Sequence, residues 1–224
     1  MNQKVNSSLI IFVSIWILIF SITYGIYLVS PKDPIENATI APKSVVYIES
    51  VDRETIEKNL EIKLKKFNRN WNRFNFKQAT DALLAGEEEF NIDHKVVLAI
   101  IALESEFKIV VARKNTDHTT DFGLTQQNSN YINGRYDRAE EILTRRKIKH
   151  SNSKFDIAKN IIAAYVYLND IKKESGYDFQ MTIKAYNVGI RGATQEKKQA
   201  KANRYFAAFA NHYRELLWVD KLII

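Results

Sequence analysis

Apolar residues recur every three or four positions through most of this chain, and few residues interrupt that spacing. The sequence has seven glycines and three prolines, and the prolines all lie between residues 31 and 42. So few helix-breaking residues argue against a turn-rich β architecture. The spacing predicts a mainly α fold with helices over 52–73, 77–89, 94–106, 136–148, 155–173, 179–187 and 196–216.

One predicted helix and one stretch between helices depart from the usual amphipathic pattern. The helix over 155–173 is apolar around much of its circumference, which predicts a central and largely buried helix. Between residues 109 and 131 the helical spacing stops, and a polar, turn-forming stretch runs from Asn115 to Asp121. We expect a small β-hairpin or an irregular loop there.

The N-terminus has no charged residue from Asn6 to Pro31. Its apolar run is long enough to cross a bilayer, which takes about 20 residues, whereas a cleaved signal peptide has a shorter apolar region. We therefore expect an uncleaved transmembrane signal-anchor helix over 1–30 in the inner (cytoplasmic) membrane. Lys4 and the amino terminus favour a cytoplasmic N-terminus, which places the remainder in the periplasm or otherwise outside that membrane. A linker over 31–50, a basic amphipathic helix over 51–75 and a domain over 76–224 would follow.

Composition excludes several kinds of chemistry. The chain has no cysteine, so disulfides, thiolate metal sites and cysteine nucleophiles are ruled out. Its four histidines have no metal-ligand spacing, and we expect neither a metal nor a cofactor. The net charge of +7 would attract an anionic partner or serve solubility alone. No zinc-finger spacing or basic–aromatic interleaving indicates nucleic acid.

The helix over 94–106 contains the candidate acid. Glu104 follows Val97 and Ile101 along the edge of the apolar face and lies in the last turn. Burial penalises a carboxylate, and the negative end of the helix dipole repels it, so both features favour the protonated form. Position alone is also compatible with a glutamate that merely reaches solvent beside the core. Glu106 lies on another face, where we expect it to be solvated.

Three sequence motifs, the first at the end of this helix, indicate a more specific function. The segment Glu104-Ser105-Glu106-Phe107 resembles the Glu-Ser-x-Phe signature of lytic transglycosylases with a lysozyme-like core. Residues 122–126, Phe-Gly-Leu-Thr-Gln, are similar to the Gly-Leu-Met-Gln element of that family, with Thr125 in place of Met. Residues 185–189, Ala-Tyr-Asn-Val-Gly, resemble its Ala-Tyr-Asn-Ala-Gly motif. Their order over residues 94–192 makes the resemblance to the lysozyme superfamily specific.

The segment between the first two motifs adds a second carboxylate. Residues 115–129 are similar to the β element of animal-type lysozymes, in which a catalytic carboxylate matches Asp121. Alternatively, Asp121 is a turn residue that accepts from backbone N–H groups. The gap from Glu104 to Gly123 exceeds that of common housekeeping transglycosylases. It is similar to that of small specialised enzymes serving secretion, conjugation or phage assemblies.

The resemblance implies an α+β lysozyme-like domain that acts on peptidoglycan glycan strands. Glu104 would protonate the β-1,4 linkage between N-acetylmuramic acid and N-acetylglucosamine, then act as base on the C6 hydroxyl to form a 1,6-anhydro end. The alternative is a retaining hydrolase that uses Glu104 and Asp121. A third possibility is a non-catalytic wall-binding assembly protein, although the intact Glu104 argues against it.

Five further residues are implied around the substrate. Tyr186 and Asn187 would lie at the rim of the cleft, unless they only form a helix end before Gly189. Gln126 and Asn128 would bind substrate or tie their loop together. Ser105 would shape the site by bonding nearby backbone.

Overall fold

The computed structural model describes residues 52–221, with side chains to residue 218. These residues lie within one compact unit. The predicted signal-anchor over 1–30 and the linker over 31–50 fall outside them, so both remain predictions. Within residues 52–221 no helix is long and apolar enough to span a bilayer.

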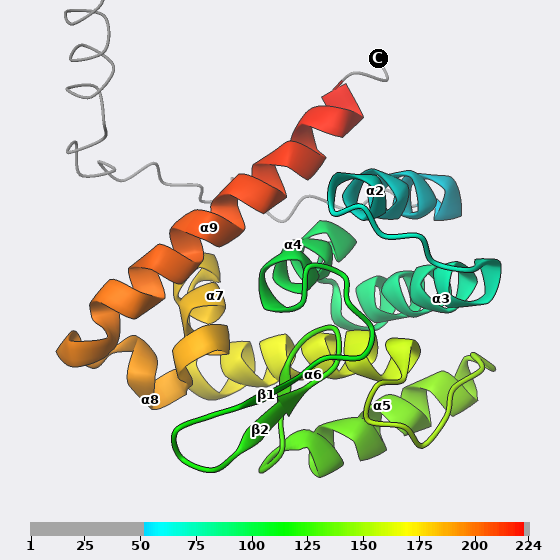
Figure 1. Cartoon of the computed structure of the whole chain (residues 1–224). Helices are drawn as coiled ribbons and strands as arrows, with labels where there is room; N and C mark the ends of the chain where they lie inside the picture. Colours follow the sequence, from blue (N-terminus) through cyan, green and yellow to red (C-terminus); the bar gives the residue numbers. More distant parts are fainter. Residues whose placement is uncertain (1–51, 222–224) are drawn as a thin grey trace, which may run out of the picture. The chain divides into compact units, whose positions relative to one another are not determined.

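The described chain is mainly helical with a small sheet, as predicted (Figure 1). Three short antiparallel strands follow one another in the order β1-β2-β3, so the sheet has one strand more than the expected hairpin. A short helix, α8, was also not predicted. In chain order the elements are α2 (Arg53–Lys66), α3 (Arg73–Phe90), α4 (His94–Glu104), β1 (Ala112–Lys114), β2 (Thr120–Phe122), β3 (Gln127–Asn128), α5 (Ile132–Arg145), α6 (Ile157–Ser175), α7 (Phe179–Val188), α8 (Ile190–Ala193) and α9 (Glu196–Lys221).

The helix expected over 52–73 ends early, at Lys66, and a turn leads into α3, which begins at Arg73 although its predicted start is residue 77. α2 ends at Lys66 because Asn68 adopts a left-handed conformation, with φ of 51°. Asn72 then caps α3, since its side chain accepts a hydrogen bond from the backbone N–H of Asn75. The apolar spacing continues across this turn because Trp71 also packs against the core.

α2 packs onto the rest of the domain through a buried face. Ile56 and Leu60 are fully buried, and so is the basic Lys63. The Lys63 amine donates to the His212 carbonyl at 2.9 Å and to the Glu215 carboxylate at 2.8 Å, both on α9. The basic character of this helix is therefore partly structural.

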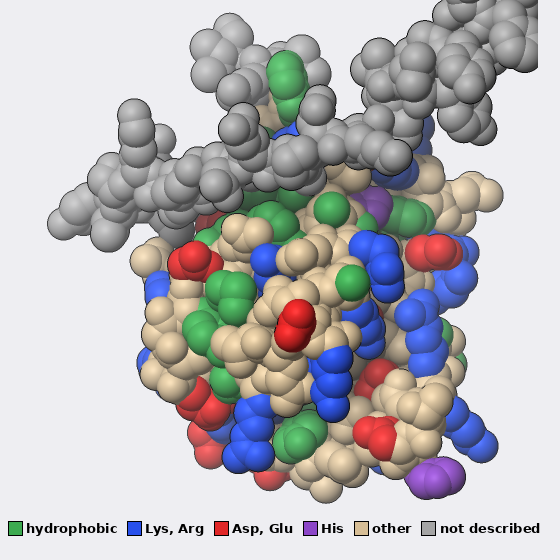
Figure 2. Space-filling model, turned by 90° about the vertical axis from the view of Figure 1, so that its left-hand side faces the viewer, with side chains coloured by type: hydrophobic (Ala, Val, Ile, Leu, Met, Phe, Trp, Pro, Cys, Tyr) green, Lys and Arg blue, Asp and Glu red, His purple; other side chains and the backbone are tan. Residues whose placement is uncertain are grey.

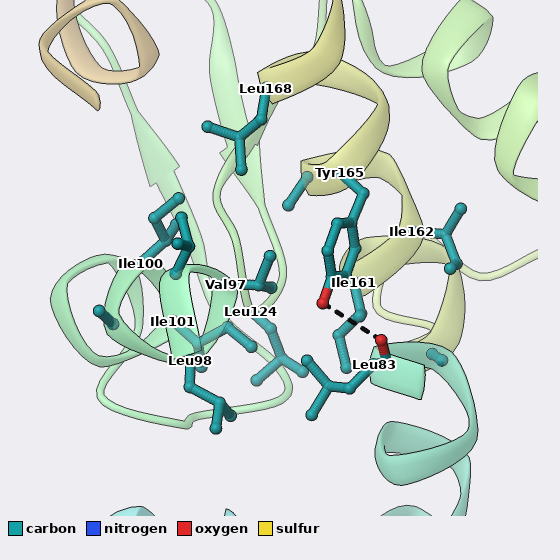
Figure 3. Packing of buried hydrophobic residues seen from close by; sticks show 14 of the residues in the cluster. Leu83, Val97, Leu98, Ile100, Ile101, Leu124, Ile161, Ile162, Tyr165 and Leu168 are labelled. Atoms are coloured by element: carbon teal, nitrogen blue, oxygen red, sulfur yellow. Dashed lines mark hydrogen bonds between the residues drawn. The ribbon is translucent and has the colours of Figure 1, made fainter. Parts of the chain in front are cut away.

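Helix α6 is the central element, as its broad apolar face predicted. It contacts α3, α5, α7, α4 and β3. Tyr165 on α6 is buried among aliphatic side chains, and its hydroxyl donates to the Leu83 carbonyl at 3.2 Å (Figure 3). Gly86 on α3 permits this approach, because a Cβ at that position would overlap the Tyr165 ring.

The sheet and α9 complete the surroundings of the α4 end. Asp121 on β2 pairs with Arg113 on β1 and with Asn128 on β3. α9 runs diagonally across the molecule and packs against α4 and α7 (Figure 1). Elements far apart in sequence therefore meet where α4 ends.

Candidate active site

Glu104 is the last residue of α4, two residues before the predicted end of that helix. The helix stops because Glu106 and Phe107 both adopt left-handed conformations, with φ of 51° and 61°. Such conformations are costly for residues other than glycine and persist only where the surroundings hold them. Glu106 is exposed, as expected. The sharp turn leaves Glu104 half-buried at the helix end.

The turn after Glu104 is held by the segment that joins α2 to α3. The Arg69 side chain donates from Nε to the Glu106 carbonyl at 2.9 Å, and Trp71 donates from Nε1 to the Phe107 carbonyl at 3.2 Å. The fully buried Phe107 ring also packs against the rings of Phe67 and Trp71. These contacts stabilise the strained backbone and thereby fix the direction of Glu104.

The electrostatic environment favours the protonated form of Glu104. Burial raises the pKa of its carboxyl from 4.5 to about 7. The hydrogen bond from Tyr205 and the nearby charges of Arg113 and Lys201 lower this pKa, whereas the charge of Asp121 raises it. Because desolvation is the largest contribution, the group is poised to lose or hold its proton near neutral pH.

Tyr205 is a site residue that the sequence analysis missed. It lies on α9, and its hydroxyl donates to Glu104 Oε1 at 2.7 Å. Burial, together with the neighbouring Glu104, raises the pKa of Tyr205 well above its usual value, so the phenol remains a donor. Glu104 Oε2 has no hydrogen-bond partner within residues 52–218 and is not sealed from solvent. The two carboxyl oxygens therefore have different environments.

Asp121 lies in strand β2 and is not the turn residue that one interpretation required. Its Oδ1 accepts from the Asn128 side-chain amide at 2.8 Å. The same amide donates to the Thr119 hydroxyl at 2.9 Å, and Asn128 Oδ1 accepts from the Asn130 N–H. Asn128 thus ties the sheet together, the second of the two roles considered for it, while Asp121 acts on Glu104 through its charge.

The second motif forms a tight loop over α6. Gly123 has a φ of 73°, and a Cβ there would overlap the side-chain amide of Asn160, so glycine is required. Thr125, at the position where the family has Met, is buried, and its hydroxyl donates to the Asn160 carbonyl at 3.0 Å. Gln126 donates to the Gly123 carbonyl at 2.8 Å. One end of the Gln126 amide therefore holds the loop.

The third motif lies partly beneath the site. Tyr186 was expected at the rim, but it is buried, and its hydroxyl donates to the Thr125 carbonyl at 2.9 Å. Burial raises the pKa of Tyr186, and the charge of Glu104 is close enough to raise it further. Gln127, which carried no prediction, donates to the Tyr186 hydroxyl at 3.2 Å. These bonds join the second motif to the third.

Two buried acceptors in these motifs have no partner within residues 52–218, namely Gln126 Oε1 and Asn187 Oδ1. A buried acceptor without a donor is costly, and a bound molecule can supply the missing bond. Asn187 lies in the last turn of α7, which Gly189 caps with a φ of 77°. Ser105 is buried and donates to the Ile101 carbonyl at 3.2 Å, the backbone contact expected of it.

One histidine does lie near two carboxylates, which its sequence spacing did not reveal. Ligand atoms of Glu87, Asp93 and His94 lie within 4.8 Å of one another. Glu87 accepts from the His94 backbone N–H and contacts its Nδ1 at 2.8 Å, while Asp93 accepts from the Lys95 N–H as the cap of α4. These groups bond one another, so the geometry has a structural explanation without a metal.

The fold and the site define a lysozyme-like class of protein, with a raised-pKa glutamate at the end of one helix and a small sheet beside it. The profile of the Transglycosylase SLT domain family matches residues 81–209, more than half of the chain, and the chain belongs to that family. Family membership supports peptidoglycan as the substrate and a lytic transglycosylase or lysozyme-like activity.

Curated relatives are similar over part of the chain. They include the invasion protein IagB of Salmonella typhimurium strains SL1344 and LT2 and of Salmonella typhi. Each is 29% identical over 136 residues, which cover 61% of this chain and 77% of the relative. No solved structure matches the chain.

Proposed function

We propose that this protein is a lytic transglycosylase that cleaves the β-1,4 bond between N-acetylmuramic acid and N-acetylglucosamine in peptidoglycan. Glu104 gives its proton to the glycosidic oxygen as the bond breaks. The resulting carboxylate then takes the proton of the sugar's C6 hydroxyl, whose oxygen closes on C1 to form a 1,6-anhydro ring. No water is consumed, and the second step is intramolecular.

The half-buried position of Glu104 at the end of α4, in contact with the Tyr205 hydroxyl, is the observation that carries this proposal. A group that donates and then accepts a proton works best when its pKa lies near the working pH, and that of Glu104 is about 7. The Tyr205 hydroxyl donates to Oε1 at 2.7 Å, a bond that suits both the acid and the carboxylate. The transferable proton is therefore assigned to Oε2, which has no partner within the described chain.

The unpartnered acceptors support a glycan as the ligand. N-acetyl sugars carry amide N–H and hydroxyl donors, and these can satisfy Gln126 Oε1 and Asn187 Oδ1. Both residues belong to the motifs that flank Glu104. We assign them to substrate binding, with Ser105, Asn128 and Tyr186 holding the surrounding backbone in place.

A retaining hydrolase is the second candidate function, and Asp121 is the observation that favours it. Its charge is close enough to raise the Glu104 pKa, so a second carboxylate lies near the first. In that mechanism Asp121 would stabilise or attack the sugar, and water would complete the cleavage. The products differ, because hydrolysis leaves reducing ends.

Product analysis tests both mechanisms. The full chain, solubilised in detergent, is incubated with purified sacculi, and released muropeptides are identified by mass spectrometry. We expect anhydro-muropeptides, and reducing-end products would instead establish the hydrolase. Asp121→Asn should reduce cleavage but leave it measurable; complete loss with an intact fold would favour the two-carboxylate mechanism. Absence of release by the wild type would leave only the wall-binding alternative.

We further propose that the N-terminal segment anchors the protein in the inner membrane with this domain in the periplasm. Peptidoglycan lies on that side of the membrane, so the substrate supports this orientation. The similarity to proteins named for invasion supports a specialised use of the activity, in a secretion, conjugation or phage assembly. Protease accessibility of the domain in spheroplasts, compared with intact and lysed cells, tests the orientation.

A further inference from the structure

A large groove lies beyond the third motif and contains none of the candidate catalytic residues. It encloses about 1120 Å³ between α5, α6 and the α7–α8 junction. Val188 and Gly189 of the motif line it, as does Tyr167, whose ring lies 5.1 Å from that of Tyr186. The groove therefore begins where the candidate active site ends.

Four basic and two acidic side chains line this groove, which gives it a net positive charge. Two of the basic side chains are already engaged. The Arg135 guanidinium lies over the Tyr167 ring at 3.4 Å and donates to Gln127 Oε1 at 3.0 Å, and Arg138 pairs with Asp170 at 2.7 Å. These two arginines therefore line the groove with their charges already engaged.

The other two basic side chains, Arg191 and Lys198, have no acidic partner within residues 52–218. Both are exposed, and they lie on the α8 side of the groove. Glu174 is the one acidic lining residue without a basic partner, so it offsets only part of their charge. The groove thus keeps a net positive charge that no ion pair within residues 52–218 neutralises.

Elsewhere within residues 52–218 some basic side chains pair with acidic ones and others, such as Lys58 and Lys65 on α2, do not, so Arg191 and Lys198 are distinguished by lining a groove. Lys63 and Lys66 on α2 both bind Glu215, and Arg145 on α5 binds Glu89. On the face that carries α8 and the start of α9, Lys and Arg side chains form a broken band around isolated acidic ones (Figure 2). Unpaired cations beside a cleft attract an anionic ligand.

We infer that this groove binds the acidic stem peptide of the peptidoglycan strand, with Arg191 and Lys198 as the residues that recognise its free carboxylates. The inference rests on the proposed function, since it assigns a part of the same substrate to a surface next to the site. Guanidinium and ammonium groups donate charge-assisted hydrogen bonds to carboxylates. The exposed Tyr131 at the groove offers a ring against which the apolar part of a peptide packs.

The test compares soluble, peptide-bearing glycan strands in two forms, with stem carboxylates free or chemically amidated. For the full-length wild type we expect kcat/KM to be about tenfold higher on the free carboxylates. In the double variant Arg191→Gln/Lys198→Gln, this ratio should fall to about one. The control variant Lys58→Gln/Lys65→Gln removes the same charge from the exposed surface of α2 and should keep the wild-type ratio.

Three outcomes would overturn the inference: a wild type that does not discriminate, a groove variant that keeps the wild-type ratio, or a control variant that loses it as completely. If the wild type cleaves both strands equally well, only this inference fails. If it cleaves neither strand, the proposed function itself fails. Thermal melts of both double variants establish that any change in the ratio is not caused by unfolding.

Discussion

A glutamate lies in a partly or fully buried position at each end of helix α4, but the groups that contact its carboxyl differ between the two ends. At the N-terminal end, Glu87 from α3 accepts from the His94 backbone N–H and contacts the His94 ring at 2.8 Å. At the C-terminal end, Glu104 accepts a neutral phenol hydrogen bond and forms no ion pair within residues 52–218. The first carboxyl faces the positive end of the helix dipole and the second its negative end.

This difference separates a carboxyl that supports the fold from one that is suited to acid–base catalysis. Glu87 connects α3 to α4, and His94 continues the connection to α2 through a contact of 2.9 Å between its Nε2 and the Asn59 amide. The Tyr205 hydrogen bond and the nearby basic residues only partly compensate Glu104, so burial still raises its pKa to about 7. A carboxyl that is only partly compensated can hold a proton near neutral pH, whereas a fully hydrogen-bonded one stabilises the fold.

The largest expected effect is on catalysis. Glu104→Gln should lower the rate of muropeptide release by about a thousandfold or more, because the amide cannot donate the acid proton. Glu87→Gln, measured per folded molecule, should stay within about threefold of the wild type. Release rates at pH 6 with a sacculus substrate provide the measurement. Comparable losses in both variants would remove the proposed distinction between the two ends.

The same substitution at Glu104 should stabilise the fold at alkaline pH. The folded carboxyl has a pKa of about 7 against 4.5 in the unfolded chain, so the folded state retains a proton that the unfolded state releases. Stability is therefore lost as the pH rises from 4.5 through 7, by up to about 3 kcal/mol. Glu104→Gln avoids this loss.

Urea unfolding of the wild type and Glu104→Gln at pH 4 and pH 8 measures that effect. The variant should be more stable than the wild type at pH 8, and the two should converge at pH 4. A variant that is less stable at both values would show that the carboxyl is compensated in the fold, contrary to the contacts around it.

Glu87→Gln should have the opposite effect on stability. It removes the charge that strengthens two bonds to His94 and that favours the start of α4, so we expect a loss of about 1–3 kcal/mol. Urea unfolding at pH 7 is the measurement. Lys58→Gln, an exposed change on α2, is the matched control and should lie within about 0.5 kcal/mol of the wild type.

Much of the fold followed from the sequence because helical spacing is a local signal. The stripes of α4 and α6 predicted their buried faces, and Glu104 was found because its place on the α4 stripe and the motif after it coincide. Helix ends were less predictable. α4 stops at Glu104 because Arg69 and Trp71 hold the next turn, and those contacts come from a segment that was expected to be helical.

The missing part of the site depends on tertiary contacts. Tyr205 is 101 residues from Glu104 in sequence and belongs to no motif, so only the course of α9 across α4 brings them together. Tyr186 was predicted at the rim of the cleft because a sequence motif gives the order of residues along the chain but not how deeply each side chain is buried. Its burial follows from the bonds that it makes with Thr125 and Gln127.

The smallest of these effects concerns Tyr205, whose hydrogen bond adjusts the pKa of Glu104 at the C-terminal end of α4. Its hydrogen bond lowers the Glu104 pKa, so Tyr205→Phe should raise it further and move the alkaline decline of activity to higher pH. The rate should also fall about tenfold at pH 6, because the carboxylate formed during cleavage loses its donor. Rate profiles from pH 5 to pH 9 measure both changes.

A profile that keeps the wild-type midpoint, or moves to lower pH, would mean that the phenol does not control the proton on Glu104. Tyr213→Phe, which alters a phenol on the same helix that contacts Asp93 at 3.4 Å, should leave the midpoint unchanged. The Tyr205 phenol at the C-terminal end of α4 would then control the pKa of the catalytic carboxyl, while the Tyr213 phenol at the N-terminal end supports the fold.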